Sequence, residues 1–150
     1  EGDIQVISAG TGIYHSEQNK RQDSQVELLQ LWLFPNEQNV SPRYDQISIR
    51  DIKKENAFYQ IISPNKEDEG SWIYQDAWMH LGDFTQETKT SYLLGKPNNG
   101  VYIFVIEGSA QIDGQTLNKR DALGVWDTAS IDFNVAKDSR ILLIDVPLKF

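Results

Sequence analysis

Residues 101–117, VYIFVIEGSAQIDGQTL, decide the fold class of this chain. The apolar positions of this stretch are mostly aromatic or β-branched, which favours strands over helices. Two residue pairs, Glu107-Gly108 and Asp113-Gly114, interrupt the stretch. Glycine supplies the positive φ that tight hairpin turns require. The stretch therefore predicts strands joined by hairpins.

The same pattern extends over the rest of the chain. Short segments rich in Ile, Val, Tyr, Trp and Phe alternate with clusters of Gly, Asn, Asp and Pro, and helical periodicity is almost absent. Strands are expected within residues 4–8, 13–17, 26–34, 47–52, 57–63, 72–84, 89–95, 101–117, 121–127, 130–136 and 140–148. Many short strands separated by turn clusters are typical of a β-sandwich or β-barrel.

Residues 26–34, VELLQLWLF, are apolar at nearly every position. In a strand, Leu29, Leu31 and Leu33 would share one face, and Trp32 and Phe34 would lie on the other. We therefore predict a strand that is buried on both sides, followed by a polar connection. The four tryptophans are expected to pack in the core or between domains rather than to form a ligand platform. They are Trp32, Trp72, Trp78 and Trp126.

Length and charge limit the classes of function. The 150 residues suit a single domain with a sizeable core, and 39% hydrophobic residues indicate an ordinary soluble globular protein. The net charge of −8 argues against nucleic acid and anionic membrane surfaces as partners, because both require clustered Lys and Arg. The chain has no cysteine, so disulfides and thiolate metal ligands are excluded. We expect a cytoplasmic protein.

Several quoted motifs resemble the pirin family of bicupins, in particular its bacterial quercetinase-like members. They are ISAGTGIYHSE at residues 7–17, LLQLWLFPNEQNVSPRYDQ at 28–46, and the later VYIFVIEGSAQIDGQTL and DALGVWD. The resemblance implies an all-β fold of two cupin-type antiparallel β-barrels, with a metal only in the first. It implies that residues 1–45 are the trailing strands of the first cupin with a linker, and that residues 46–150 are a complete, metal-free second cupin.

The resemblance also implies the candidate site. The family's metal is held by three histidines and a glutamate; His15 and Glu17 match the later two ligands, and nothing here matches the upstream His-x-His pair. On a strand, residues two apart share a face and can converge on one cation. The intact family is expected to hold a divalent transition metal (Fe, Cu, Ni, Co, Mn or Zn), and Glu17 is the inherited catalytic base. Without the resemblance, this pair is more often a solvent-exposed polar pair. His80 is expected to pack rather than to join the site.

Three readings of the function follow from these observations. The first is a relative of the metal-dependent quercetin 2,3-dioxygenases, which open flavonols with dioxygen; this chain is expected to be incomplete and inactive, with half of the metal ligands absent. The second is a non-catalytic cupin-fold module for binding or interaction, as in the nuclear branch of the family, and a third reading is a metal-binding protein formed by dimerisation. Expected partners are a flavonol-like small molecule and a second copy, paired through the exposed leading strands.

Overall fold

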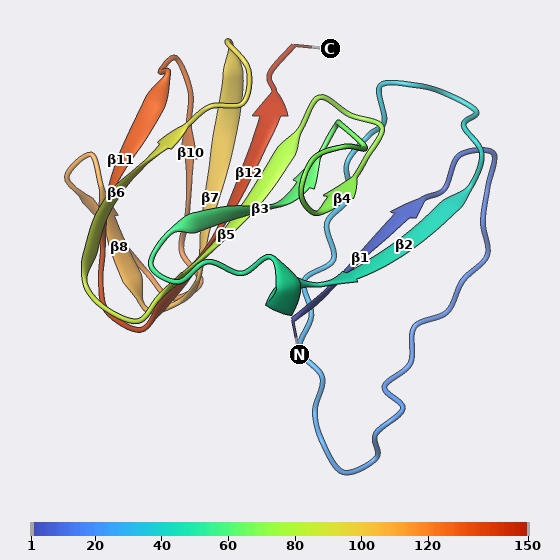
Figure 1. Ribbon diagram of the computed structural model, residues 1–150, viewed down its shortest axis with the longest axis horizontal. Coiled ribbons are helices and arrows are strands. Elements are labelled where there is room, and N and C mark those ends of the chain that lie inside the picture. Colours follow the sequence, from blue (N-terminus) through green and yellow to red (C-terminus); the bar gives the residue numbers. More distant parts are fainter. Residues whose placement is uncertain (1, 150) are drawn as a thin grey trace.

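A computed structural model describes residues 2–149, and strands make up most of the ordered elements (Figure 1). The strands are β1 (Asp3–Ser8), β2 (Arg43–Ser48), β3 (Phe58–Ser63), β4 (Ser71–Trp72), β5 (Trp78–Phe84), β6 (Thr88–Leu93), β7 (Asn99–Glu107), β8 (Ser109–Ile112), β9 (Gln115–Asn118), β10 (Ala122–Val125), β11 (Ser130–Val135) and β12 (Ser139–Pro147). A single turn of 3₁₀ helix, η1 (Ile49–Asp51), follows β2. The all-β prediction is confirmed.

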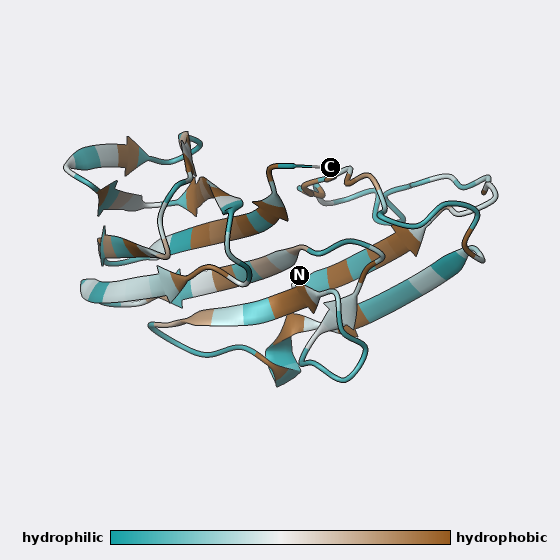
Figure 2. Ribbon diagram, turned by 90° about the horizontal axis from the view of Figure 1, so that it is seen from above, coloured by the Kyte–Doolittle hydropathy of each residue, from teal (hydrophilic) through white to brown (hydrophobic). Residues whose placement is uncertain are grey.

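Two facing sheets form the barrel-like body. The larger sheet has the order β10-β7-β12-β5-β3-β4 and the smaller sheet has the order β6-β11-β8-β9. Neighbouring strands are antiparallel except for the short parallel pair of β3 and β4. The middle strand of the larger sheet, β12, pairs with β5 on one side and with β7 on the other. Figure 2 shows apolar bands running along these strands.

The sequence of β12 explains its central position. Residues 139–147, SRILLIDVP, contain an unbroken apolar run, and such runs are typical of strands that are buried on both faces. Ile141 and Leu143 point between the two sheets, whereas Leu142 and Ile144 pack on the outer face of the larger sheet. The alternation of side chains along the strand thus joins two apolar clusters.

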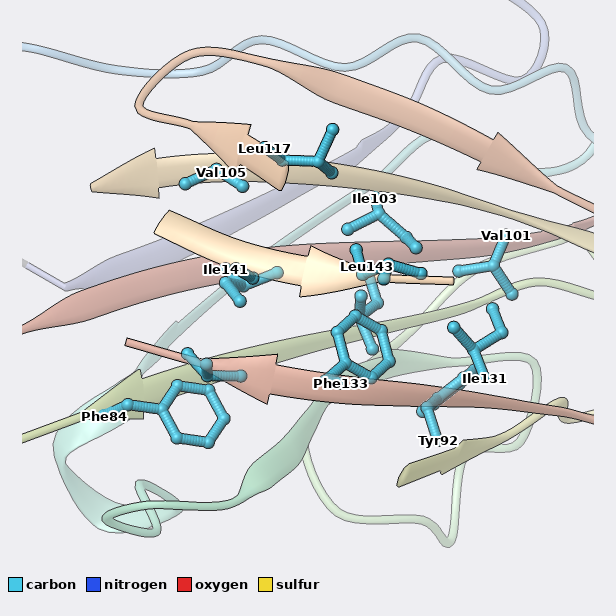
Figure 3. Close-up of a cluster of buried hydrophobic side chains, with 13 residues drawn as sticks. Phe84, Tyr92, Val101, Ile103, Val105, Leu117, Ile131, Phe133, Ile141 and Leu143 are labelled. Atoms are coloured by element: carbon cyan, nitrogen blue, oxygen red, sulfur yellow. The ribbon is translucent and has the colours of Figure 1, made fainter. Parts of the chain in front are cut away.

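The first cluster fills the space between the sheets (Figure 3). Phe84 comes from the larger sheet and Phe133 from the smaller one, and Phe58 packs edge-on against both rings, with centroids 5.4 and 5.0 Å away. The buried residues of this cluster are Phe84, Tyr92, Val101, Ile103, Val105, Ala110, Ile112, Leu117, Ile131, Phe133, Val135, Ile141 and Leu143. Side chains therefore occupy the interior of the barrel.

A two-stranded ribbon, β1 paired with β2, covers the outer face of the larger sheet. Its register places Ile4 opposite Ile47 and Val6 opposite Asp45. Val6 is buried in the second cluster, together with Ile49 of η1 and Met79 and Leu81 of β5. The ribbon is thus the third layer of the molecule. The predicted domain boundary at residues 45 and 46 falls inside β2 and stays a prediction.

The two Gly-containing turns of the opening stretch behave differently. Asp113 and Gly114 have φ of 47° and 75° and join the paired strands β8 and β9, so the predicted hairpin is confirmed there. The hairpin predicted at Glu107-Gly108 is wrong, because β7 and β8 belong to different sheets. Gly108 instead turns the chain from one sheet into the other, at φ 74°. A Cβ there would lie 2.1 Å from Ser139 Oγ, so only glycine fits this corner.

The segment between β1 and β2, residues 9–42, contains no strand; we call it the leading loop. In Figure 1 it leaves the body of the molecule as a long blue excursion. The strands predicted at residues 13–17 and 26–34 are therefore wrong. A strand needs a partner for its backbone N–H and C=O groups, and no strand among residues 2–149 pairs with these segments. Trp32 and Trp126 are exposed, at 88% and 60%, so the prediction that the tryptophans pack in the core or between domains is wrong for these two.

Candidate metal-binding and ligand site

The leading loop begins and ends at one tight contact. Gly10 has φ 53°, and a Cβ on it would lie 2.0 Å from the carbonyl oxygen of Val40. The Thr11 N–H donates to that same oxygen at 3.2 Å, and the Gly12 N–H donates to the carbonyl of Ala9 at 2.8 Å. The Ser-Ala-Gly-Thr-Gly segment therefore forms a turn that brings residue 11 against residue 40. Glycine is required at position 10 both by the positive φ and by the close approach.

His15 and Glu17 lie on this loop, a few residues beyond the turn. Both side chains are exposed, and neither residue is in a strand, so the strand geometry expected for them is not present. His15 lies at a shallow pocket of about 300 Å³. The pocket is lined by Ile7, Ile13, Tyr14, His15, Pro42, Arg43 and Tyr44. Glu17 is not among the lining residues.

A complete transition-metal centre needs more ligands than this pair. The two-His-one-carboxylate set is a minimal arrangement for redox chemistry, and four ligands are usual for a closed site. No group of three or more His, Asp or Glu side chains within residues 2–149 is placed to hold a metal ion. The donors present therefore do not fit a full metal centre, and two exposed, unoriented side chains supply only part of one.

Arg43 connects the pocket to the barrel. Its Nη1 donates to the carbonyl oxygen of Trp72 at 2.7 Å, and its Nη2 donates to Asp45 Oδ2 at 2.7 Å. The guanidinium also lies 4.2 Å from the centroid of the Trp72 ring, a cation–π contact. Ser71 Oγ donates to the same Asp45 oxygen at 2.6 Å. One pocket wall is thus held rigidly against β4, whereas the wall formed by residues 13–15 belongs to the loop.

The second histidine, His80, lies on β5 and faces the barrel interior. Its ring packs edge-on against Tyr92, with centroids 5.0 Å apart, and its Nδ1 is buried without a hydrogen-bond partner. Burial lowers the pKa of His80 to about 4, and the charge of Lys54 adds to this, although Asp145 acts in the opposite direction. His80 is therefore a neutral, packed residue, as expected, and it is not brought to His15.

Asp145 is a fully buried carboxylate that the sequence analysis missed. Its Oδ2 accepts hydrogen bonds from Tyr92 Oη at 2.9 Å and from the Gly95 N–H at 2.6 Å, and its Oδ1 accepts one from Asn99 Nδ2 at 2.6 Å. Burial and this carboxylate together raise the pKa of Tyr92. The available signal was a lone acid inside the apolar run of β12, because a buried charge requires partners.

Asp83, on β5, is a second buried carboxylate, and its neighbours are hydrogen-bond donors and cations. It accepts hydrogen bonds from Tyr59 Oη and Arg140 Nε, each at 2.6 Å, and Lys53 Nζ lies 3.7 Å away. Burial opposes its ionisation, but these hydrogen bonds and the two cations outweigh burial and lower the pKa of Asp83. Asp83 and Asp145 lie on opposite faces of the larger sheet and do not form a common site.

The fold defines a cupin-type β-barrel protein. A family model of the quercetinase C-terminal cupin domain matches residues 60–146, and a model described as pirin matches residues 1–33. The chain belongs to the pirin family.

Several known proteins are similar to this chain. The quercetin 2,3-dioxygenase of Escherichia coli K12 is 30% identical over 146 residues, which are 97% of this chain and 62% of that protein. A pirin-like protein of Caulobacter vibrioides is 29% identical over 145 residues. The crystal structure of the bacterial pirin YhhW of E. coli in complex with nickel(II) has a TM-score of 0.88 and 29% identity, over 97% of this chain and 62% of that one.

This chain thus spans about 62% of the length of the relatives it matches. Among residues 2–149, no helix is both long and apolar enough to cross a membrane.

Proposed function

We propose that this chain supplies the C-terminal barrel and two metal ligands, His15 and Glu17, of a pirin-type flavonol dioxygenase, and that it does not turn over flavonols by itself. Membership of the pirin family and the quercetin 2,3-dioxygenases among its relatives support the activity. The observation that carries the second half of the proposal is the donor count, since two exposed donors do not make a complete site.

The ligand proposed for the pocket is a flavonol-like small molecule. Ile13, Tyr14 and Tyr44 offer apolar and aromatic surface for planar rings, and His15 lies at the same pocket. Glu17 is the residue proposed to accept the proton of a substrate hydroxyl. Glu17 lies two residues beyond His15 in the chain but is not among the residues that line the pocket.

Metal titration tests the ligand assignment. Nickel(II) added to the purified chain should bind weakly, and both His15→Ala and Glu17→Gln should abolish this binding. The matched control is His80→Ala, which removes the other histidine of the chain and should leave nickel binding unchanged. Tight binding that survives His15→Ala would contradict the assignment.

Oxygen consumption tests the activity. With quercetin and a saturating divalent metal, the chain should consume no oxygen above the background of metal and quercetin alone. Sustained turnover by the metal-loaded chain, abolished by Glu17→Gln, would show that the chain is an enzyme in its own right and would overturn the second half of the proposal.

A non-catalytic binding module is the second candidate. It is favoured by the interior of the barrel, which apolar side chains fill, so that the body of the molecule offers a surface rather than a reaction chamber. Absence of any measurable metal binding would favour this candidate. The lack of nucleic-acid and membrane partners is a prediction that rests on the acidic composition, and a cytoplasmic location stays a prediction.

A further inference from the structure

Asn99 and Gly100, at the start of β7, form a dipeptide that is chemically labile in an unfolded chain. Among the asparagines of the sequence, only Asn99 is followed by glycine. The backbone nitrogen that follows an asparagine can attack the side-chain amide carbon, and a glycine leaves this nitrogen unhindered because it has no Cβ. Asparagine is accordingly one of the thermolabile residues of proteins. We therefore expect loss of the amide to be fastest at this dipeptide.

The folded chain holds Asn99 in a geometry that prevents this attack. Asn99 is 2% exposed, and its Nδ2 donates to Asp145 Oδ1 at 2.6 Å. Its backbone N–H donates to the carbonyl oxygen of Lys96 at 3.3 Å, and strand pairing places it opposite Pro147 of β12. To reach the nitrogen of Gly100, the side chain would have to leave Asp145 and turn back on its own backbone inside a close-packed interior. The reaction therefore has to wait until this end of β7 opens.

The product of the reaction cannot replace Asn99 in the fold. A carboxylate at position 99 donates no hydrogen bond, and one of its oxygens would lie where Nδ2 now lies, 2.6 Å from Asp145 Oδ1. Asp145 is fully buried and already accepts hydrogen bonds from Tyr92 Oη and the Gly95 N–H. Two buried carboxylates this close cannot both be ionised, so the folded state would have to take up a proton. The isoaspartyl product would also lengthen the backbone of β7 by a methylene group and disturb its pairing with β12.

We propose that Asn99-Gly100 is a deamidation site that the fold protects, and that its reaction in the unfolded chain prevents correct refolding. In this reaction the Gly100 nitrogen loses its proton and bonds to Cγ of Asn99, the bond from Cγ to Nδ2 breaks, and the side-chain nitrogen leaves as ammonia. Water then opens the succinimide to an aspartyl or isoaspartyl residue, so one water is consumed for each ammonia released. A chemical change that outpaces refolding makes unfolding irreversible. This proposal stands apart from the metal and flavonol chemistry proposed above.

Peptide mapping by mass spectrometry is the first test. The full chain is incubated at neutral pH, natively and in guanidinium chloride, and the replacement of NH₂ by OH is followed at each asparagine. Asn99 should deamidate at least about 30-fold more slowly in the native sample, because the native reaction requires local opening. In guanidinium chloride Asn99 should react before every other asparagine. Equal rates in the two samples, or an earlier reaction at another asparagine in denaturant, overturns the proposal.

Gly100→Ala is the matched control, because it keeps both Asn99 and Asp145. The added Cβ would lie 2.8 Å from Leu148 Cδ2, and Leu148 is 50% exposed, so its side chain can move aside and the variant should fold. The methyl group hinders the attacking nitrogen, so deamidation of Asn99 in guanidinium chloride should be several-fold slower than in the wild type. An unchanged rate in the variant would show that the Gly100 nitrogen is not the attacking group.

Refolding tests the consequence for the fold. After incubation in guanidinium chloride, the wild-type chain is diluted into buffer, and the folded and aggregated fractions are separated by size-exclusion chromatography. The folded fraction should retain the Asn99 amide, and the deamidated chain should collect in the aggregated fraction. The Gly100→Ala variant should refold with a higher yield after the same incubation. Equal proportions of deamidated chain in the two fractions would show that the fold tolerates the product.

Two substitutions isolate the effect of the second charge. At neutral pH Asn99→Asp should unfold at a lower urea concentration than Asn99→Ala, because alanine removes the hydrogen bond without adding a carboxylate. Acidification should narrow this difference, since a protonated carboxyl group can donate to Asp145 as the amide does. The other titratable groups that face Asp145, Tyr92 on β6 and His80 on β5, are the same in both variants and cancel in the comparison. An Asn99→Asp chain as stable as Asn99→Ala at neutral pH overturns the role assigned to Asp145.

Discussion

His80→Gln should change how the stability of the protein depends on pH. The imidazole of His80 packs against the Tyr92 ring inside the barrel, and its buried Nδ1 has no hydrogen-bond partner. Burial is the main cause that lowers the pKa of His80 to about 4; Asp145 opposes the effect and Lys54 adds to it. The folded protein therefore holds His80 neutral at a pH where the unfolded chain takes up a proton.

The sign and size of the effect follow from these two pKa values. In the unfolded chain His80 has the ordinary pKa of 6.5. The contribution of neutral His80 is fully present above pH 6.5 and is lost as the pH falls from 6.5 to about 4, because protons then favour the unfolded state. At pH 5 the loss is about 2 kcal/mol, and it approaches about 3 kcal/mol below pH 4.

Urea denaturation at pH 7 and pH 5, followed by tryptophan fluorescence, measures this loss. The wild-type chain should lose about 2 kcal/mol more than His80→Gln between the two pH values, whatever the absolute stability of the variant. His15→Gln is the matched control, because it removes the other histidine, which is exposed, and it should keep the wild-type loss. Equal losses in the wild type and His80→Gln would refute the assignment.

Three further substitutions test the packing. Asp145→Asn should lower the free energy of unfolding by about 2–4 kcal/mol, because an amide cannot accept hydrogen bonds from all three buried donors. The control is Asp132→Asn, at an exposed position, which should change the free energy of unfolding by less than about 0.5 kcal/mol. Equal effects of the two substitutions would contradict this prediction. Phe133→Ala should lower the free energy of unfolding by about 3–5 kcal/mol in the same urea experiment, because it leaves a cavity between the two sheets. A loss below about 1 kcal/mol would show that neighbouring side chains move in to fill the cavity. Arg43→Ala should lower the free energy of unfolding by about 1–3 kcal/mol and accelerate hydrogen exchange in β2, since it removes the hydrogen bonds to the Trp72 carbonyl and to the Asp45 carboxylate. Unchanged exchange in β2 would show that these hydrogen bonds do not stabilise the ribbon.

Only part of the candidate site could be predicted from the sequence. The turn, His15 and Glu17 stand out because of the resemblance of residues 7–17 to pirins, and nothing in their spacing alone identifies them as metal ligands. The strand geometry expected for the pair is absent, because the leading loop has no partner strand among the described residues. Asp145 escaped notice for a different reason: its three partners are 46 to 53 residues away in the chain.

Most strands of the barrel could be predicted from the sequence because their signals are local. Alternating side chains, β-branched and aromatic composition and glycine turns act over a few residues, so each strand of the barrel carries its own signal. Residues 28–34 carry that signal too, but they do not form a strand. A high β-propensity favours the extended conformation, but a segment becomes part of a sheet only when a neighbouring strand hydrogen-bonds to its backbone.

The amino-acid sequence by itself determined the all-β class, the family, and which segments alternate between apolar and polar faces. The tertiary structure alone decided which strands share a sheet, that Gly108 turns a corner instead of closing a hairpin, and that Asp83 and Asp145 are buried among donors. The two groups of features differ because local patterns depend only on residues a few positions apart in the sequence. Sheet membership, burial and hydrogen-bond partners depend on residues tens of positions apart.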